Sequence, residues 1–258
     1  MSDWDALEPI DKYMMAKLAN LLTEVEEAYD NYKFNAVYRV AYDFVNDLSS
    51  VYMDVTKDRL YSEAPNSPRR RAVQTVLENI LDVLVRVLSP ILSFTSEEVW
   101  ECYPDGLSKD TDRPISVQLA GWPSVADFTP ALPADKGKDA LESFSVALEV
   151  RDVVTKALED ARVEKFINKS QEAAVVVTIP DDMAQALAGF GESTLEELFI
   201  TSGVSICVGD NMACEVKHAQ GQKCPRCWNY RELGVNDAHA EVCERCANVL
   251  DELGFVEE

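Results

Sequence analysis

Four of the seven cysteines have the spacing of ligands to a single metal ion. Cys224 and Cys227 form one Cys-x2-Cys pair, fifteen residues follow, and Cys243 and Cys246 form a second pair. A two-residue gap lets both sulfurs of a pair reach one ion, and two such pairs fill a tetrahedral Zn²⁺ shell. The sequence therefore predicts one structural zinc ion at these cysteines. Because protein ligands take every position, we expect no water-activating role for the metal.

Other uses of cysteine and histidine remain open. The pairs could hold an iron–sulfur cluster or work as a redox dithiol, and His239 lies close enough to the second pair to replace a thiolate. The remaining cysteines lie in or beside apolar sequence, so we expect them to be small buried side chains. They are Cys102, Cys207 and Cys214.

The cysteine segment also carries groups that recognise RNA. Arg226, Arg231 and Arg245 could hold phosphates, while Trp228 or Tyr230 could stack on an unpaired base. Between positions 217 and 246 five basic residues accompany four acidic ones, although the whole chain has a net charge of −22. Such an acidic chain gains no long-range attraction to nucleic acid, so any RNA contact must be local. The alternative is that the arginines are solvated and that Trp228 packs under the metal.

A second basic group flanks the turn between two expected helices. A cluster of this kind at one end of a helix bundle predicts a phosphate contact, although Arg59 could instead pair with Asp54 or Asp58. The group consists of Lys57, Arg59, Arg69, Arg70 and Arg71.

No residue pattern predicts a catalytic centre. The first hundred residues contain no histidine, which excludes a di-iron site built on Glu-x-x-His pairs. The ten glycines never take a phosphate-loop spacing, and His218 and His239 both flank the cysteine segment.

Amphipathic helices must position these residues. Apolar side chains recur every three or four residues over 9–29, from about Asn35 to the turn before Pro68, and over 68–89. Thr95 predicts the start of a short fourth helix through a capping box with Glu98. Helices with one apolar stripe each bury those stripes against one another, so we predict a helix bundle over residues 1–103.

The period of the apolar residues changes in the second half. Residues 104–137 contain five prolines and predict a connector packed on the bundle, with one extended piece at 115–119. Residues 138–216 predict a long helix, to about Phe166, and a small α+β unit. Its expected strands are 173–179, 204–208 and 213–216, and its expected helices are 181–188 and 194–199. Residues 217–258 predict the zinc knuckle and an acidic tail. The expected fold class is mainly α.

Several runs resemble the anticodon-binding bundle of isoleucyl-tRNA synthetases. They are Asp47-Leu48-Ser49-Ser50, Tyr52, Asp54, the run from Lys57 to Tyr61, Gln74 to Leu77, and Phe94 to Trp100. A knuckle whose second cysteine precedes tryptophan, as Cys227 precedes Trp228, is similar to that of the bacterial isoleucine enzymes. The resemblance covers nearly the whole chain but only the C-terminal part of such an enzyme.

The resemblance implies a function in tRNA recognition. It implies that the bundle and knuckle bind the anticodon arm of tRNA(Ile), and that ATP-dependent charging belongs to a catalytic domain this chain lacks. Alternatives are the equivalent part of a valine, leucine or methionine enzyme, or a scaffold whose knuckle docks a partner protein. With no apolar run long enough for a membrane span and no secretory signal, we expect a cytoplasmic monomer.

Overall fold

The computed structural model describes residues 3–103 and 114–255. The chain forms two compact units, and each combines segments that are distant in sequence. The first unit comprises Met1–Tyr52 and Arg71–Leu141, and the second comprises Met53–Arg70 and Glu142–Glu258. Two long helices, α5 (Pro68–Leu88) and α7 (Lys136–Val163), contribute residues to both units.

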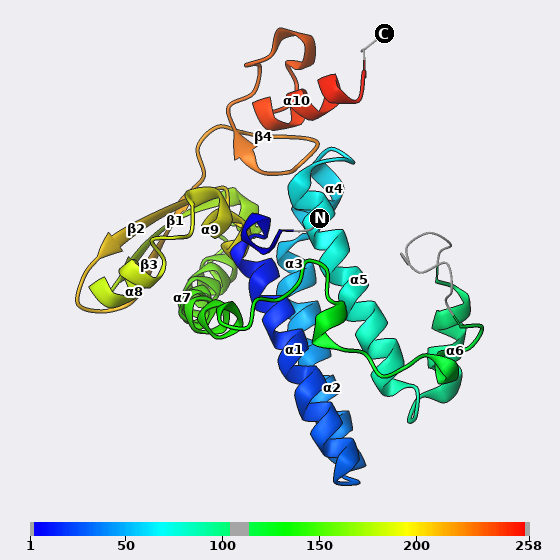
Figure 1. The fold of residues 1–258 in the computed structure, drawn as a ribbon. Coiled ribbons are helices and arrows are strands. Elements are labelled where there is room, and N and C mark those ends of the chain that lie inside the picture. The colour runs from blue at the N-terminus through cyan, green and yellow to red at the C-terminus, as the bar shows by residue number, and fades with distance from the viewer. Residues whose placement is uncertain (1–2, 104–113, 256–258) are drawn as a thin grey trace. The chain divides into compact units, whose positions relative to one another are not determined.

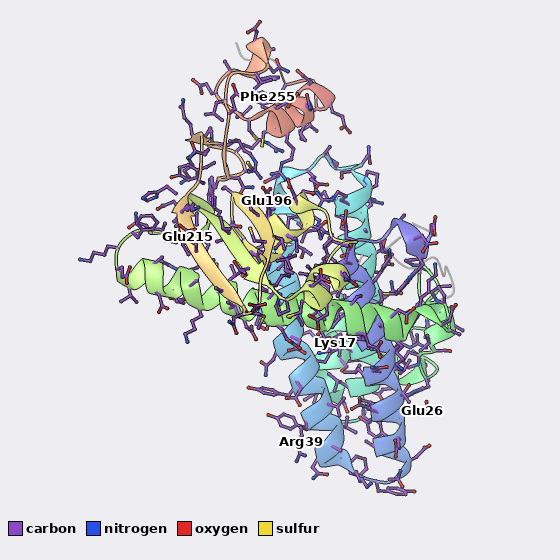
Figure 2. All side chains as sticks on the ribbon, turned by 90° about the vertical axis from the view of Figure 1, so that its left-hand side faces the viewer. Lys17, Glu26, Arg39, Glu196, Glu215 and Phe255 are labelled. Atoms are coloured by element: carbon purple, nitrogen blue, oxygen red, sulfur yellow. The ribbon has the colours of Figure 1, made fainter. Side chains whose placement is uncertain are left out.

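A helical hairpin is the centre of the first unit. Helices α1 (Pro9–Asp30) and α2 (Phe34–Asp47) lie side by side (Figure 1). The face of α1 that carries Met14, Leu18 and Val25 is fully buried, as its three- and four-residue apolar spacing predicts. Polar side chains such as Glu26 and Arg39 project from the outside of the hairpin (Figure 2).

The rest of the first unit is helical and irregular. It contains α6 (Ser93–Glu101) and short 3₁₀ turns at Trp4–Ala6, Val117–Leu119 and Val125–Asp127. Val85 of α5, Trp100 of α6 and Val117 form one buried cluster. The bundle therefore has a small second core besides the one along α1.

A mixed sheet is the centre of the second unit. The strands β1 (Ala173–Ile179), β2 (Gly203–Val208) and β3 (Ala213–His218) take the order β2-β1-β3. β1 is parallel to β2 and antiparallel to β3. Parallel neighbours need a crossover, which α8 (Asp181–Ala186) and α9 (Glu192–Phe199) supply.

Short elements complete the second unit. They are α3 (Met53–Val55), α4 (Lys57–Ser62), a 3₁₀ turn at Ser170–Glu172, the paired strands β4 (Gln222–Lys223) and β5 (Tyr230–Arg231), a 3₁₀ turn at Asp237–His239, and α10 (Glu244–Glu252). The predicted fold class, mainly α with a small α+β unit, is confirmed, and the sheet of that unit is mixed.

Three local predictions need correction. The second predicted helix is not continuous, because a π-helical turn occupies Leu48–Tyr52. There the hydroxyls of Ser49 and Ser50 both donate to the carbonyl of Asn46, and so compete with the helical backbone. Helix α6 begins before Thr95, since the Leu92 carbonyl already accepts from the Ser96 amide at 2.8 Å.

The third correction concerns the expected extended piece at 115–119. Its end is a 3₁₀ turn, because the amide of Val117 donates to Glu97 Oε2 at 2.8 Å and its side chain is buried in the small core. The first ten residues of the predicted connector, 104–113, lie outside the described residues.

Candidate metal centre and nucleic-acid interface

Two short loops bring the four predicted cysteines together. Cys224 and Cys227 lie between β4 and β5, whereas Cys243 is the N-cap of α10 and Cys246 lies in its first turn. All four sulfur atoms lie within 4.8 Å of one another, and Cys227 Sγ is 3.8 Å from Cys243 Sγ. We call residues 222–252 the four-cysteine module.

Backbone hydrogen bonds hold the first loop around its sulfurs. The Trp228 amide donates to the Cys224 carbonyl, and the Cys224 amide donates to the Asn229 carbonyl, each at 2.9 Å. Trp228 has a φ of 67°, in the left-handed region that few non-glycine residues adopt. The tight turn therefore imposes a backbone conformation that the surrounding contacts must stabilise.

The donor set fits a zinc ion. With Zn–S bonds of about 2.3 Å, the sulfurs of a tetrahedral site are about 3.8 Å apart, close to the separation between Cys227 and Cys243. Hydrogen bonds from Cys227 and Cys246 lower the pKa of the Cys243 thiol to about 3, so the cluster favours a thiolate there. Four clustered cysteine sulfurs are therefore consistent with a zinc-binding site.

His239, the candidate substitute ligand, lies outside the sulfur cluster. Its side chain is buried, and its Nε2 is 3.1 Å from Asp251 Oδ1. Asp251 also accepts from Asn236 Nδ2 at 2.9 Å. The histidine therefore braces the loop before Cys243 against α10.

The module has a small core of its own. Cys224, Cys243 and Cys246 are buried together with Val242 and Ala247, and only three partly buried apolar residues pack against them. Such a core buries little apolar surface, so much of the stability of the module must come from the cysteines themselves.

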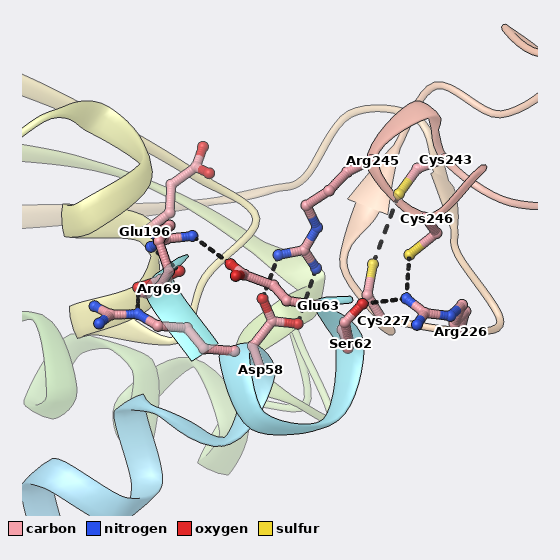
Figure 3. Close-up of polar contacts among 12 residues, drawn as sticks. Asp58, Ser62, Glu63, Arg69, Glu196, Arg226, Cys227, Cys243, Arg245 and Cys246 are labelled. Carbon is pink, nitrogen blue, oxygen red and sulfur yellow. Dashed lines mark hydrogen bonds and ion pairs between the residues drawn. The ribbon is translucent and has the colours of Figure 1, made fainter. Parts of the chain in front are cut away.

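Two of the predicted RNA-binding arginines bind other parts of the second unit. Arg226 donates to the carbonyl of Ser62 and, at 3.6 Å, to Cys246 Sγ. Arg245 donates from both terminal nitrogens to the carboxylate of Asp58, with Nη2 2.9 Å from Oδ1 (Figure 3). Sequence reasoning missed both partners.

Glu197 of α9 joins two further predicted arginines. Arg59 is completely buried, with its Nε 2.9 Å from Glu197 Oε2. Arg69 Nη2 is 2.5 Å from Glu197 Oε1, and its Nη1 is 2.7 Å from Glu63 Oε1. Arg59 forms an internal brace, the alternative that the sequence left open, and one partner is Glu197, which the sequence did not suggest.

Arg231 is also paired within the second unit. Its Nη2 is 2.5 Å from Glu196 Oε2, and its Nη1 donates to the Ser202 carbonyl. Burial raises the pKa of Glu196, although the charge of Arg231 opposes that rise. The pair ties β5 to the end of α9.

The remaining basic candidates differ in exposure. Lys57 is exposed and pairs with Asp54 at 2.7 Å, and Arg71 is exposed and donates to Gln74 at 3.1 Å. Arg70 is half-buried and donates to the Glu63 carbonyl at 3.3 Å. Lys57 and Arg71 thus keep their charges in solvent.

Trp228 lies close to two lysines and much of its ring is exposed. Its exposed fraction is 55%, and the ammonium groups of Lys169 and Lys223 lie 5.4 Å and 5.7 Å from its ring. These distances allow cation–π attraction. Lys169 was not a sequence candidate, because no local signal connects it to a tryptophan far along the chain.

A hollow of about 640 Å³ lies within the second unit beside the module. Trp228, Asn229 and Ser193 contribute to its wall, with six acidic and four basic residues. The volume lies in the range of small-molecule sites, but the mixed charges do not favour phosphate. The charged lining residues are Asp54, Asp58, Glu196, Glu197, Glu232, Glu244, Lys57, Arg69, Arg231 and Arg245.

The cysteines outside the module are not the buried side chains that we expected. Cys102 and Cys207 are exposed, and Cys214 is half-buried. Cys102 caps the end of α6, and Cys207 lies near the end of the sheet's edge strand β2, so neighbouring apolar sequence did not place either in a core.

Hydropathy gives one more negative finding. Among the helices within 3–103 and 114–255, none has the length and apolar character required to span a bilayer.

Comparison with family models gives two matches. The model described as the anticodon-binding domain of tRNA ligase matches residues 11–177, which is more than half of the chain. The model described as the zinc finger found in FPG and IleRS matches residues 221–249 and so includes all four clustered cysteines.

Curated proteins give the same relationship. The isoleucine–tRNA ligase of Moorella thermoacetica is 41% identical over an alignment of 261 positions, which covers 95% of this chain and 27% of the ligase. Those of Natranaerobius thermophilus and Thermotoga petrophila are 38% and 36% identical, over 96% of this chain and 27% of each ligase. The chain spans about a quarter of the length of these relatives.

Proposed function

The chain belongs to the family of anticodon-binding domains of tRNA ligases, and from this premise we propose that it binds the anticodon arm of tRNA(Ile). The observation that carries the proposal is the half-exposed ring of Trp228, which lies close to Lys169 and Lys223 and contributes to the wall of a polar hollow. An exposed ring stacks on an unpaired base, and flanking cations contact the adjacent phosphates.

The internal pairing of the arginines limits this interface. Arg226, Arg231 and Arg245 already have acceptors within the chain, so the phosphate contacts fall to the exposed lysines Lys57, Lys169 and Lys223. Few contacts and a net charge of −22 imply weak binding. The polar groups around the hollow then discriminate between bases.

The four-cysteine module holds one structural zinc ion in this proposal. Cys224, Cys227, Cys243 and Cys246 are its ligands, and the ion supplies folding energy rather than chemistry. Thiols remain reduced in the cytoplasm, where we place the protein, as a monomer.

The proposal includes a division of labour along the chain. It assigns the anticodon-binding bundle to residues 1–103, the connector to 104–137, the junction unit to 138–216 and the knuckle to 217–258. ATP-dependent charging is the work of other parts of a ligase, about three quarters of the length of the relatives. The match to a zinc finger named for the isoleucine enzyme favours it over the valine, leucine and methionine enzymes.

Binding of tRNA transcripts tests the proposal. We expect tRNA(Ile) to bind more tightly than the same transcript with a swapped anticodon. If three to five phosphates are neutralised, log-affinity should fall against log-salt with a slope of about −2 to −5. Equal affinity for both transcripts at moderate salt would refute the anticodon assignment.

A protein-interaction scaffold is the second candidate. The net charge favours it, and so does a stripe of exposed aromatic side chains, Phe34, Tyr38 and Tyr42, at four-residue spacing on one face of α2. If the chain binds tRNA(Ile) and the anticodon-swapped transcript equally well, the interaction scaffold becomes the better supported function.

A further inference from the structure

The two cysteine loops are built alike around an arginine. In each Cys-x2-Cys pair the residue before the second cysteine is arginine, Arg226 in the first and Arg245 in the second. Arg226 Nη1 is 3.6 Å from Cys246 Sγ, a sulfur of the other loop. Arg245 lines the same hollow as Cys227, a residue of the first loop. Arg226 therefore reaches across the cluster to a cysteine of the opposite pair, and Arg245 lies beside the first pair.

The same guanidinium groups hold one helix. Arg226 donates to the carbonyl of Ser62, and Arg245 donates to the carboxylate of Asp58 (Figure 3). Asp58 and Ser62 are four residues apart on α4, so they lie on the same face of that helix. Ser62 is the last residue of α4, and its carbonyl has no helical partner, so the arginine supplies a donor that the helix end lacks.

The net charge of the metal-bound cysteine cluster explains why two arginines lie beside it. A divalent ion on four thiolates leaves a net charge of about −2, and hydrogen bonds to the sulfurs stabilise that charge. Arg226 and Arg245 supply two positive charges beside the sulfurs. A guanidinium keeps its charge under all ordinary conditions, and both terminal nitrogens of Arg245 donate to the carboxylate of Asp58.

We propose that Arg226 and Arg245 are positioning residues that couple metal retention by the four cysteines to the ordered position of α4. With metal, the thiolates and α4 hold both guanidiniums from opposite sides. Without metal, the small core of the module loses its centre and the arginines lose their sulfur partners. The proposal rests on the zinc part of the proposed function and not on RNA binding.

Linkage makes the coupling reciprocal. If zinc binding shifts the equilibrium between ordered and disordered α4 by a given factor, then ordering of α4 raises the zinc affinity by the same factor. Because Lys57 and Asp58 of α4 line the hollow beside Trp228, the metal then controls whether this wall of the hollow is formed.

The informative variant is Asp58→Asn, because Asp58 touches an arginine but no sulfur. It keeps the size of the side chain and removes the charge that holds Arg245. In equilibrium competition between the full chain and pyridylazoresorcinol, we expect this variant to bind zinc at least about fivefold more weakly. Arg226→Gln and Arg245→Gln act directly beside the sulfurs, so their zinc affinity should fall about 10- to 100-fold.

A matched control and a second readout separate coupling from general loosening. Glu196→Gln removes the partner of Arg231 in the same hollow but leaves both arginine contacts to α4, and zinc affinity should be unchanged. Amide hydrogen exchange over Lys57–Ser62 should rise when zinc is removed from the wild-type chain, while exchange in α1 should not. Neither measurement involves RNA, so failure to bind tRNA leaves this test intact.

Two results would overturn the proposal. One is a zinc affinity of Asp58→Asn equal to that of the wild-type chain. The other is unchanged exchange of Lys57–Ser62 after chelation. If Arg226→Gln or Arg245→Gln does not fold, the comparison of Asp58→Asn with Glu196→Gln still tests the proposal.

Discussion

Arg59 and Glu197 form an ion pair in the interior of the second unit, with Arg59 Nε 2.9 Å from Glu197 Oε2. The exposed fractions of the two side chains are 0% and 9%. Glu197 also binds Arg69, so one carboxylate of α9 holds two arginines that lie on either side of the turn between α4 and α5. The pair therefore belongs to the buried framework of the second unit, and Glu197 also contributes to the wall of the hollow.

Removing one partner of this pair should destabilise the protein strongly. Arg59→Met leaves Glu197 buried with less compensation, and breaking such a pair costs about 3–5 kcal/mol. Denaturant unfolding followed by circular dichroism measures the change. As a control, Asp54→Asn breaks the exposed pair with Lys57 and should cost less than about 1 kcal/mol. Similar small losses from both variants would contradict the structural role of Arg59.

Metal analysis should find one zinc per chain, because one set of four sulfurs lies together among the described residues. The double variant Cys224→Ser with Cys243→Ser removes half of the ligands and should lose the metal. Cys102→Ser, at an exposed cysteine on α6, should retain it. Elemental analysis of both proteins checks this, and zinc that survives the double substitution would place the site elsewhere.

Trp228→Ala should weaken tRNA(Ile) binding by about 1–3 kcal/mol and reduce discrimination between anticodons, because base stacking is lost. Trp122→Ala is the matched control, since Trp122 is another partly exposed tryptophan, which packs edge-on against Tyr29 in the first unit. Fluorescence anisotropy with a labelled anticodon stem-loop measures both. If the two variants bind alike, Trp228 does not stack on a base.

Lys169→Ala should weaken binding to all tRNAs by a similar factor and make the salt slope shallower by about 1, because one phosphate contact is removed. Its effect should not depend on the anticodon. A change in anticodon preference would instead show that Lys169 orients the Trp228 ring, over which its ammonium group lies.

Cys214 should resist alkylation at about pH 8, where Cys102 and Cys207 react. Burial raises the pKa of the Cys214 thiol from 9.0 to about 11, which lowers its thiolate fraction about 100-fold. The reaction should accelerate as pH approaches 11. Since the unfolded thiol loses its proton at lower pH than the folded one, stability should also fall as pH rises from 9 to 11. Mass spectrometry after iodoacetamide treatment follows each site, and modification of Cys214 as fast as Cys207 would contradict its burial.

Local patterns in the sequence were enough to predict most of the elements. Helices α1 and α5 and strand β1 follow from apolar residues repeated at a helical or strand period, since one face of each is buried against the core. The cysteine cluster follows in the same way, because a two-residue gap already places both sulfurs of a pair on one side of a tight turn. The π-turn at Leu48–Tyr52 was missed, because its cause is a competition between serine hydroxyls and backbone that spacing does not reveal.

The partners of the charged side chains were decided only by the tertiary structure. The sequence identified Arg59, Arg226 and Arg245 as basic groups near the relevant motifs, but both phosphate and carboxylate are good acceptors for a guanidinium. The choice between them depends on which acceptor the fold brings near. Asp58 is 187 residues from Arg245, and Glu197 is 138 residues from Arg59, so no local pattern could connect them. A charge is read from one position in the chain, whereas an ion pair exists only where folding makes two distant positions adjacent.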